Sequence, residues 1–190
     1  MLAKKYVQKS IETKQKILSS DIILNIVNKI ADEIIKVYRH GNKVIFVGNG
    51  GSAADAQHLA AELVSKFYFE RKALDAVALT TNTSILTAIA NDYDFENVFS
   101  RQLEACGKKG DLLFSISTSG SSKNVILAIK TAKKIGMKSI SFTGEMESEM
   151  SELSDITLKI PSDETPIIQE SHIMLGHVIC AIVESSLIKK

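Results

Sequence analysis

The sequence feature that most constrains the fold of this chain is the stretch 44–62, which reads VIFVGNGGSAADAQHLAAE. It begins with a short apolar run, passes through the glycine-rich segment 48–52 and continues as an alanine-rich sequence typical of a helix. A buried strand, a glycine turn and a helix N-terminus present free backbone N–H groups and a positive dipole end to an anion. The stretch therefore predicts the first strand–helix unit of an α/β fold, with a binding site at the turn.

Length and composition indicate one globular domain and exclude several functional classes. The chain has 190 residues, of which 45% are apolar and 24% charged, which is enough for one well-buried core. Its 23 Lys and Arg balance 22 Asp and Glu, and it has no Trp, so we expect no nucleic-acid partner. We see no signal peptide or spanning apolar run and expect a cytoplasmic protein. Cys106 and Cys180 lack metal-site spacing and are expected to be reduced, buried thiols.

The N-terminal region predicts a long helix over about 10–40, because Ile23, Val27, Ile30 and Ile34 recur at helical spacing. Further isoleucines widen this stripe beyond what one core-facing side needs, which suggests a second surface against another subunit. The segment 19–21 (SSD) is a candidate internal cap or break, and Gly41 suits the residue after the helix end. We therefore expect residues 1–40 to be a helical oligomerisation segment.

From Gly41 onward, strand and helix patterns alternate along the chain. Such alternation implies right-handed crossovers and a doubly wound, parallel five-stranded sheet with helices on both faces. The expected strands are 43–47, 76–79, 111–116, 138–142 and 156–160. The expected helices are 52–69, 83–91, 95–105, 123–135 and 165–189. Residues 41–190 are thus one α/β domain, and the whole chain forms one structural unit.

The first turn formally matches a dinucleotide-binding fingerprint, since Gly48, Gly50 and Ala53 fit G-x-G-x-x-A. That fingerprint also requires an acidic residue at the end of the second strand for the ribose, and this chain has Thr-Thr-Asn at 80–82. No Gly-Lys-Ser/Thr follows, so it is not a Walker A loop. A nicotinamide-dependent oxidoreductase is therefore only a third-ranked alternative.

The second turn, 117–122, follows an apolar strand and carries five hydroxyl groups, at Ser117, Thr118, Ser119, Ser121 and Ser122. Hydroxyl donors together with helix N-terminal amides form a phosphate cradle that needs no lysine. Ser and Thr are also favoured helix N-caps, so an ordinary cap cluster is the alternative. One or two hydroxyls would satisfy a cap, and a run of five favours phosphate.

Four polar residues on two helices form a candidate metal site. His58 and Glu62 are four residues apart, and Gln169 and His177 are eight apart, so each pair shares a helix face. Nitrogen and oxygen ligands of this kind suit zinc or a similar divalent ion. The alternatives are a solvated helix face for the first pair and a core histidine for His177. Glu170 and His172 are competing candidates on the last helix, and His40 is expected to have no site role.

Glu62 and His177 also suit proton transfer. In aldose–ketose isomerisation, a carboxylate removes the proton from the carbon beside the carbonyl. An imidazole relays a proton to the carbonyl oxygen. Asn91 and Asp92 can hydrogen-bond sugar hydroxyls, although an Asn-Asp pair serves a helix end and turn equally well.

Five blocks of sequence together resemble the phosphoheptose isomerase family of the sugar isomerase (SIS) domain proteins. They are GNGGSAADAQHLAAEL at 48–63, TSILTAIANDY at 83–93, FSRQ at 99–102, STSG at 117–120 and QExH at 169–172. The likeness extends from about residue 42 to the C-terminus. Two departures are Ser121, where the family often has Asn, and the segment 67–72, where Arg71 is a candidate phosphate contact.

This resemblance implies conversion of sedoheptulose 7-phosphate to D-glycero-D-manno-heptose 7-phosphate, the first step toward the heptose of bacterial surface polysaccharide. It implies a homotetramer with active sites between subunits, and one zinc ion per subunit. The metal ligands would be His58, Glu62, Gln169 and His177, with Glu62 as general base and His177 as its acid partner. Substrate contacts would come from Asn49, Gly50, Gly51, Glu62, Asn91, Asp92, Ser117, Thr118, Ser119, Ser122 and Gln169.

Two alternatives remain within this resemblance. One is a non-catalytic tetrameric relative that binds a replication-initiation protein, but such a chain is expected to lose part of the metal and acid–base set. The other is an arabinose 5-phosphate isomerase, whose chains usually carry additional regulatory domains.

Overall fold

The computed structural model describes residues 1–188 of the chain. Its helices are α1 (Leu2–Leu18), α2 (Asp21–Arg39), α3 (Gly51–Val64), α4 (Thr83–Asp92), the 3-10 turn η1 (Phe95–Asn97), α5 (Ser100–Cys106), α6 (Lys123–Ile135), α7 (Glu149–Leu153) and α8 (Thr165–Ile188). Its strands are β1 (Val44–Gly48), β2 (Ala76–Ala78), β3 (Leu112–Ile116), β4 (Lys138–Thr143) and β5 (Ile156–Lys159). The predicted end of the last helix at Lys189 lies outside the described residues.

The five strands form one parallel sheet in the order β2-β1-β3-β4-β5, which confirms the predicted fold class. Strands β1 and β3 are buried along their whole length, as expected for a parallel sheet covered on both faces. Side chains alternate between the two faces, so Val44 and Phe46 join one core and Ile45 and Val47 join the other.

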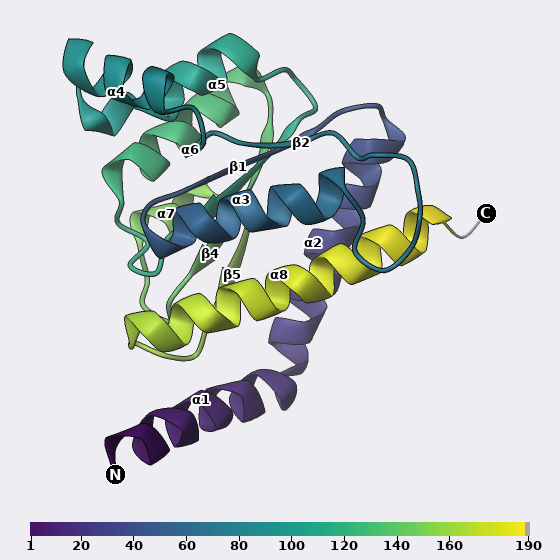
Figure 1. Ribbon diagram of the computed structural model, residues 1–190, viewed down its shortest axis with the longest axis vertical. Coiled ribbons are helices and arrows are strands. Elements are labelled where there is room, and N and C mark those ends of the chain that lie inside the picture. Colours follow the sequence, from purple (N-terminus) through teal and green to yellow (C-terminus); the bar gives the residue numbers. More distant parts are fainter. Residues whose placement is uncertain (189–190) are drawn as a thin grey trace.

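Two helical layers cover the sheet (Figure 1). Helices α2, α3 and α8 pack on one face, around Phe46, Phe114 and Phe142. Helices α5 and α6, with the short α7, pack on the other face. Since α3 follows β1 and α6 follows β3, the chain leaves these neighbouring strands toward opposite faces. The gap between β1 and β3 is therefore the topological switch point, where doubly wound sheets bind ligands at the strands' carboxyl ends.

The N-terminal region is helical as predicted, but it begins earlier and divides into two helices. Ser20 is the N-cap of α2 and its side chain accepts a hydrogen bond from Ile23 N, which confirms the break suspected at the SSD segment. Gly41, with φ of +73°, ends α2 as expected. Helix α1 projects from the body of the molecule (Figure 1).

Other boundaries differ from the prediction at a few places. Helix α3 ends at Val64, five residues before the predicted end, because its last carbonyls bond the side chain of Arg71. The predicted helix 95–105 is divided into η1 and α5. Helix α7 was not predicted; its five residues follow a Ser148 capping box. Helix α6 agrees with the prediction at both ends.

Helix α8 alone among the described helices is long and apolar enough to cross a membrane by length and composition. No spanning apolar run was expected from the sequence, and length and composition alone are weak evidence for one. Forty-four per cent of its most apolar window is buried inside the protein, where α8 packs against α2 and α3. Such packing is typical of a core helix of a globular domain, and core helices also meet the length and composition criterion for a membrane span.

Two glycines of the first turn are needed for different reasons. A Cβ on Gly48 would lie 2.5 Å from the carbonyl oxygen of Ser52, so any side chain there collides with the first turn of α3. Gly50 has open space around it but adopts φ of +53° with ψ of −122°, a backbone conformation that residues with a Cβ rarely adopt. The sharp passage from β1 into α3 thus depends on both.

These two glycines allow a matched test of the turn. We expect Gly48→Ala to lower the free energy of unfolding by about 3 kcal/mol, because backbone must move to relieve the overlap. Gly50→Ala should cost about 2 kcal/mol, from the strain of its positive-φ backbone alone. Urea unfolding of both variants checks this order, and equal losses would contradict it.

Candidate active site

Helices α3 and α8 lie side by side and carry the central residues of the site (Figure 1). Their approach is close because Gly176 of α8 faces Leu59 of α3, where a Cβ would come within 2.6 Å of the leucine Cδ2. Gly176 thereby brings the following residue, His177, to the α3 surface. The small residues Ala56 and Ala60 on α3 are buried against the same packed region.

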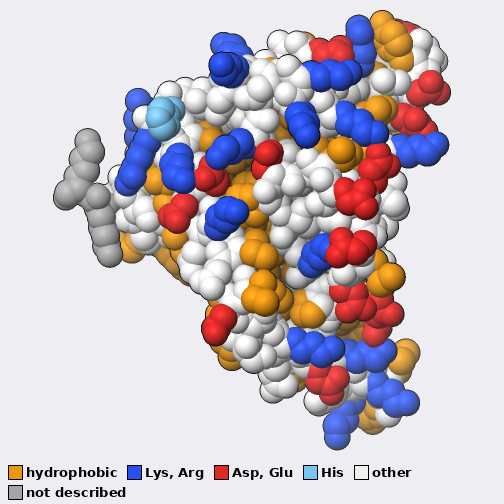
Figure 2. Space-filling view, turned by 180° about the vertical axis from the view of Figure 1, so that it is seen from behind, with side chains coloured by type: hydrophobic (Ala, Val, Ile, Leu, Met, Phe, Trp, Pro, Cys, Tyr) orange, Lys and Arg blue, Asp and Glu red, His pale blue; other side chains and the backbone are white. Residues whose placement is uncertain are grey.

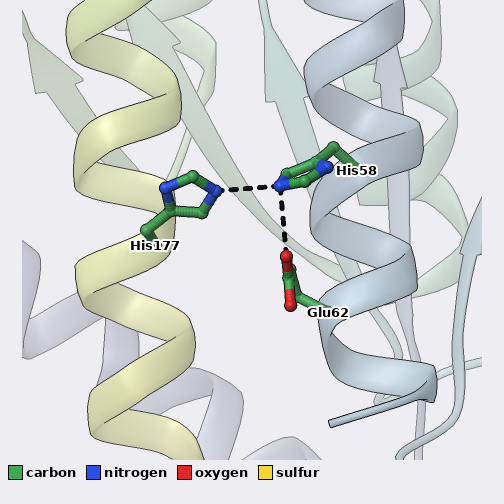
Figure 3. A group of neighbouring side chains, drawn as sticks. All are labelled: His58, Glu62 and His177. Carbon is green, nitrogen blue, oxygen red and sulfur yellow. Dashed lines mark hydrogen bonds and ion pairs between the residues drawn. The ribbon is translucent and has the colours of Figure 1, made fainter. Parts of the chain in front are cut away.

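His58, Glu62 and His177 point toward one another (Figure 3). The Nε2 atoms of His58 and His177 are 2.9 Å apart, and His58 Nε2 lies 3.1 Å from Glu62 Oε1. Candidate ligand atoms from all three residues fall within 4.8 Å of one another. Two imidazoles and a carboxylate are a donor set that suits zinc, so the residues present fit a divalent metal. The cluster faces solvent, since the His58 side chain is 50% exposed.

Gln169 lies two turns before His177 on α8, and its amide contacts a residue to which the sequence gave no specific role. Gln169 Nε2 donates a hydrogen bond of 2.7 Å to Asp55 Oδ1, one turn before His58 on α3. Asp55 is only 4% exposed, and burial raises its pKa to about 6 even though the Gln169 bond and His58 act to lower it. The spacing of Asp55 three residues before His58 was the available signal for its place on this face.

The hydroxyl groups of 117–122 gather at the carboxyl end of β3. Ser117 Oγ lies 2.9 Å from Ser122 Oγ and 3.4 Å from Ser119 Oγ, and Ser121 N donates to Ser119 Oγ. Ser122 is the N-cap of α6, yet its side chain makes no capping hydrogen bond. The simple cap alternative is thus not realised here. The hydroxyls bond one another at the start of α6, where a phosphate would find several donors.

Asn49 joins the two turns. Its side chain exchanges two hydrogen bonds, of 2.8 and 2.9 Å, with Asn124 in the first turn of α6. Asn124 is buried, and sequence reasoning did not single it out. Because Gly48 and Ile116 are partners in the β1–β3 ladder, both turns leave the sheet at the same edge. The predicted sugar-binding and phosphate-binding turns are therefore neighbours.

Asn91 and Asp92 lie apart from these groups, at the end of α4. Asn91 Nδ2 donates to Asp92 Oδ1 at 2.9 Å, and both residues are exposed. Within residues 1–188 neither makes a hydrogen bond to the other candidate site residues. Asp92 lines a hollow of about 550 Å³ between α4 and α5, together with Tyr93 and Arg101.

Arg71 does not contact a phosphate site; it is held in a buried ion pair with Glu184 of α8. The two side chains are 6% and 1% exposed, and Arg71 Nε lies 2.9 Å from Glu184 Oε1. Arg71 also donates to the carbonyls of Glu62 and Leu63, at the end of α3. The structure therefore gives Arg71 a structural partner, and its bonds in residues 1–188 go to Glu184, the end of α3 and the loop after it rather than to the hydroxyl turn.

Glu184 completes this arrangement by accepting three backbone N–H bonds from the loop after α3, from Phe67, Tyr68 and Phe69. Burial acts to raise the pKa of Glu184, but these donors and the Arg71 charge hold it below its usual value. The Phe67 ring lies against His177, with ring centroids 5.8 Å apart. The ion pair therefore anchors the loop beside the histidine cluster.

Removal of the carboxylate of this pair should destabilise the protein. We expect Glu184→Gln to lower the free energy of unfolding by about 3 kcal/mol, because it leaves Arg71 buried without a counter-charge. Lys130→Gln breaks the exposed pair with Glu149 and should cost less than about 1 kcal/mol. Denaturant unfolding compares the two variants, and a Glu184→Gln loss as small as that of Lys130→Gln would contradict the prediction.

The competing candidates on α8 have other roles. His172 is fully buried, its Nε2 contacts the Thr143 carbonyl oxygen at 3.1 Å, and its ring packs on Phe142. Glu170 pairs with Lys14 of α1 at 2.6 Å. His40 ends α2 and its Nδ1 contacts the Lys36 carbonyl oxygen, as expected. Cys180 is a buried free thiol as expected, whereas Cys106 is only half-buried.

His172 should make stability depend on pH. Burial lowers its pKa to about 4 from an ordinary 6.5, so the unfolded chain binds the proton more readily. Between those values the folded state loses stability as pH falls, by about 3 kcal/mol in total. In metal-free protein, His172→Gln should show a correspondingly smaller loss between about pH 7 and pH 4. Urea unfolding at both pH values measures it, and parallel losses in the two proteins would contradict it.

Comparison with known proteins bears on this fold and site. The SIS domain family profile matches residues 5–144. A phosphoheptose isomerase from Aneurinibacillus thermoaerophilus is 50% identical over 186 residues, which cover 98% of this chain and 94% of that protein. Solved structures of phosphoheptose isomerases from Neisseria gonorrhoeae and Francisella tularensis superpose with TM-scores of 0.90 and 0.92. Their identities are 41% and 33%, and each comparison covers 96% of this chain and at least 96% of the solved chain.

The parallel sheet, the two turns at its switch point and these likenesses agree with one another. The chain belongs to the SIS domain family and, within it, to the phosphoheptose isomerases. It is an isomerase. The non-catalytic alternative is not favoured, because the relatives at about half identity are named as isomerases.

Proposed function

We propose that this protein converts sedoheptulose 7-phosphate to D-glycero-D-manno-heptose 7-phosphate, through an enediolate, for bacterial surface polysaccharide. The observation that carries the proposal is the His58–Glu62–His177 cluster, built where α3 and α8 meet. The names of the relatives support the heptose phosphate as substrate. As an intramolecular aldose–ketose isomerisation, the reaction needs proton transfers between carbon and oxygen, and no outside oxidant.

Glu62 acts as the general base in this proposal and His177 as the acid. Glu62 removes the proton from the carbon beside the substrate carbonyl, and the same carboxyl group can return it to the neighbouring carbon. His177 donates a proton to the substrate oxygen, or accepts one from it, as that oxygen changes between carbonyl and hydroxyl. Glu62 is half-buried and lies within hydrogen-bond reach of His58, which keeps the carboxylate oriented toward the cluster.

The substrate phosphate is assigned to the hydroxyl turn, through Ser117, Thr118, Ser119 and Ser122. These residues lie at the N-terminus of α6, where backbone N–H groups add to the hydroxyl donors. The sugar chain is assigned to Asn49, Gly50, Gly51 and Gln169, and the carboxylate of Glu62 contacts it as well. Contacts from Asn91 and Asp92 come from a neighbouring subunit, since α4 has no buried residue of its own.

We assign one zinc ion per subunit to His58, Glu62, Gln169 and His177. When bound, zinc supplies a Lewis acid that stabilises the negative oxygen of the enediolate. Gln169 would bind through its amide oxygen, since its amide nitrogen donates to Asp55.

We further propose a cytoplasmic homotetramer, with residues 1–40 as the oligomerisation segment and residues 41–190 as the SIS domain. The exposed large hydrophobics of α1 and the start of α2 support an association role, and they are Leu2, Tyr6, Val7, Ile11, Leu18 and Ile22. Figure 2 shows hydrophobic side chains gathered among charges of both signs on the rear face of the molecule. A monomer has little reason to expose such a surface.

The test is turnover of sedoheptulose 7-phosphate by the purified protein, with the heptose phosphate product detected by NMR. We expect wild-type turnover, and a loss of kcat of at least about 10³-fold in Glu62→Gln, because the base is removed while the side-chain volume is kept. Incubation with a chelator reports whether bound metal contributes to the rate.

A matched control is Glu33→Gln, which alters a carboxylate of α2 that pairs with Lys36 and Lys138 away from the cluster. It should keep wild-type turnover. Absence of turnover by the wild type, or full activity in Glu62→Gln, would overturn the proposed function.

A further inference from the structure

We propose that Asp55 is a positioning residue that selects the orientation of the Gln169 amide, so that the amide oxygen is the atom presented to the metal. The inference rests on the proposed function, which assigns Gln169 as a ligand. Asp55 itself is not one of the proposed ligands or substrate contacts.

The contact between the two side chains is short, buried and directional. Gln169 Nε2 donates to Asp55 Oδ1 at 2.7 Å, and Asp55 is only 4% exposed. The second carboxylate oxygen, Oδ2, is buried and has no hydrogen-bond partner among the described residues. A buried carboxylate with one unpaired oxygen is costly to the fold, so its place beside Gln169 indicates a role other than stability.

The chemistry of the pair explains the selection. The two ends of a glutamine amide have nearly the same shape, but only the oxygen can bind a metal ion. An ionised carboxylate accepts hydrogen bonds and donates none, so Asp55 holds the nitrogen end of the amide. The flipped amide would place Oε1 against a carboxylate oxygen. With the nitrogen held, the oxygen remains available for the metal site.

The surrounding residues confine Gln169 in this position. A Cβ on Gly51 would lie 3.4 Å from Gln169 Cγ, so the side chain fits between the start of α3 and Asp55. Asp55 precedes His58 by one turn of α3, and Gln169 precedes His177 by two turns of α8. The Asp55–Gln169 pair therefore continues the same helix–helix seam toward the N-terminal ends of both helices.

The simpler account is a hydrogen bond that only joins α3 to α8. The two accounts differ in what happens to Asp55→Asn, which keeps the volume but can pair with either end of the amide. A purely structural bond predicts unchanged zinc affinity. A positioning role predicts zinc affinity lower by about 10- to 100-fold, with metal-free stability unchanged or raised because a buried carboxylate is gone.

The test measures zinc affinity by competition with a chromophoric chelator, and metal-free thermal stability, in a double-mutant cycle. Asp55→Asn and Gln169→Glu should each weaken zinc binding, the second because two carboxylates then face one another. The double variant should bind zinc more tightly than Gln169→Glu alone, by about tenfold or more. In the double variant, the asparagine amide at position 55 donates to one oxygen of the carboxylate at position 169. The other oxygen of that carboxylate stays free to bind zinc. Asp32→Asn, on the exposed side of α2, is the matched control and should bind zinc as the wild type does.

The outcomes separate this inference from the proposed function. If Gln169→Ala weakens zinc binding and Asp55→Asn does not, the positioning role is overturned and the metal site stands. Additive losses in the double variant overturn it as well. If the wild type binds no zinc, or Gln169→Ala binds it normally, the ligand assignment of Gln169 and this inference both fall.

Discussion

The packing of α3 against α8 is the contact on which the candidate site depends. Gly176 lets α8 approach Leu59 so closely that His177 meets His58 and Glu62 across the seam. The same seam brings Gln169 to Asp55 two turns earlier. Rigid helices on one hydrophobic core hold these polar groups in place better than loops would, because neither helix can move without disturbing buried side chains.

The sheet sets the second half of the site. Because β1 and β3 are neighbours whose connections leave toward opposite faces, their two turns open at one edge. Asn49 and Asn124 bond across the opening, and the hydroxyls of 117–122 lie beside them. A turn suited to phosphate and a cluster suited to proton transfer thus share one side of the molecule. The arrangement suits an isomerase whose substrate carries its phosphate far from the reacting carbons.

Sequence reasoning succeeded where one local pattern decided the structure. Helix α6 was predicted to the residue, because its apolar face is regular and Gly136 ends it in a left-handed conformation. It failed where a distant side chain decided. Helix α3 stops at Val64 because Arg71 and Glu184 reorganise the following loop, and Glu184 lies more than a hundred residues away. No local pattern contains that information.

The sequence by itself determined the alternation of strands and helices, the two turns, and the residue types that suit metal and proton chemistry. Residue spacing alone left His172 as a competitor of His177 on α8, and the structure buries His172 and brings His177 to the cluster. Apolar residues are spread around that helix rather than confined to one face, so its periodicity could not separate buried His172 from His177. The tertiary structure also revealed Asp55, whose role depends on a partner 114 residues away. The angle and position at which two helices pack decide which of their side chains meet. That packing depends on both helices together, so no single segment of sequence encodes it.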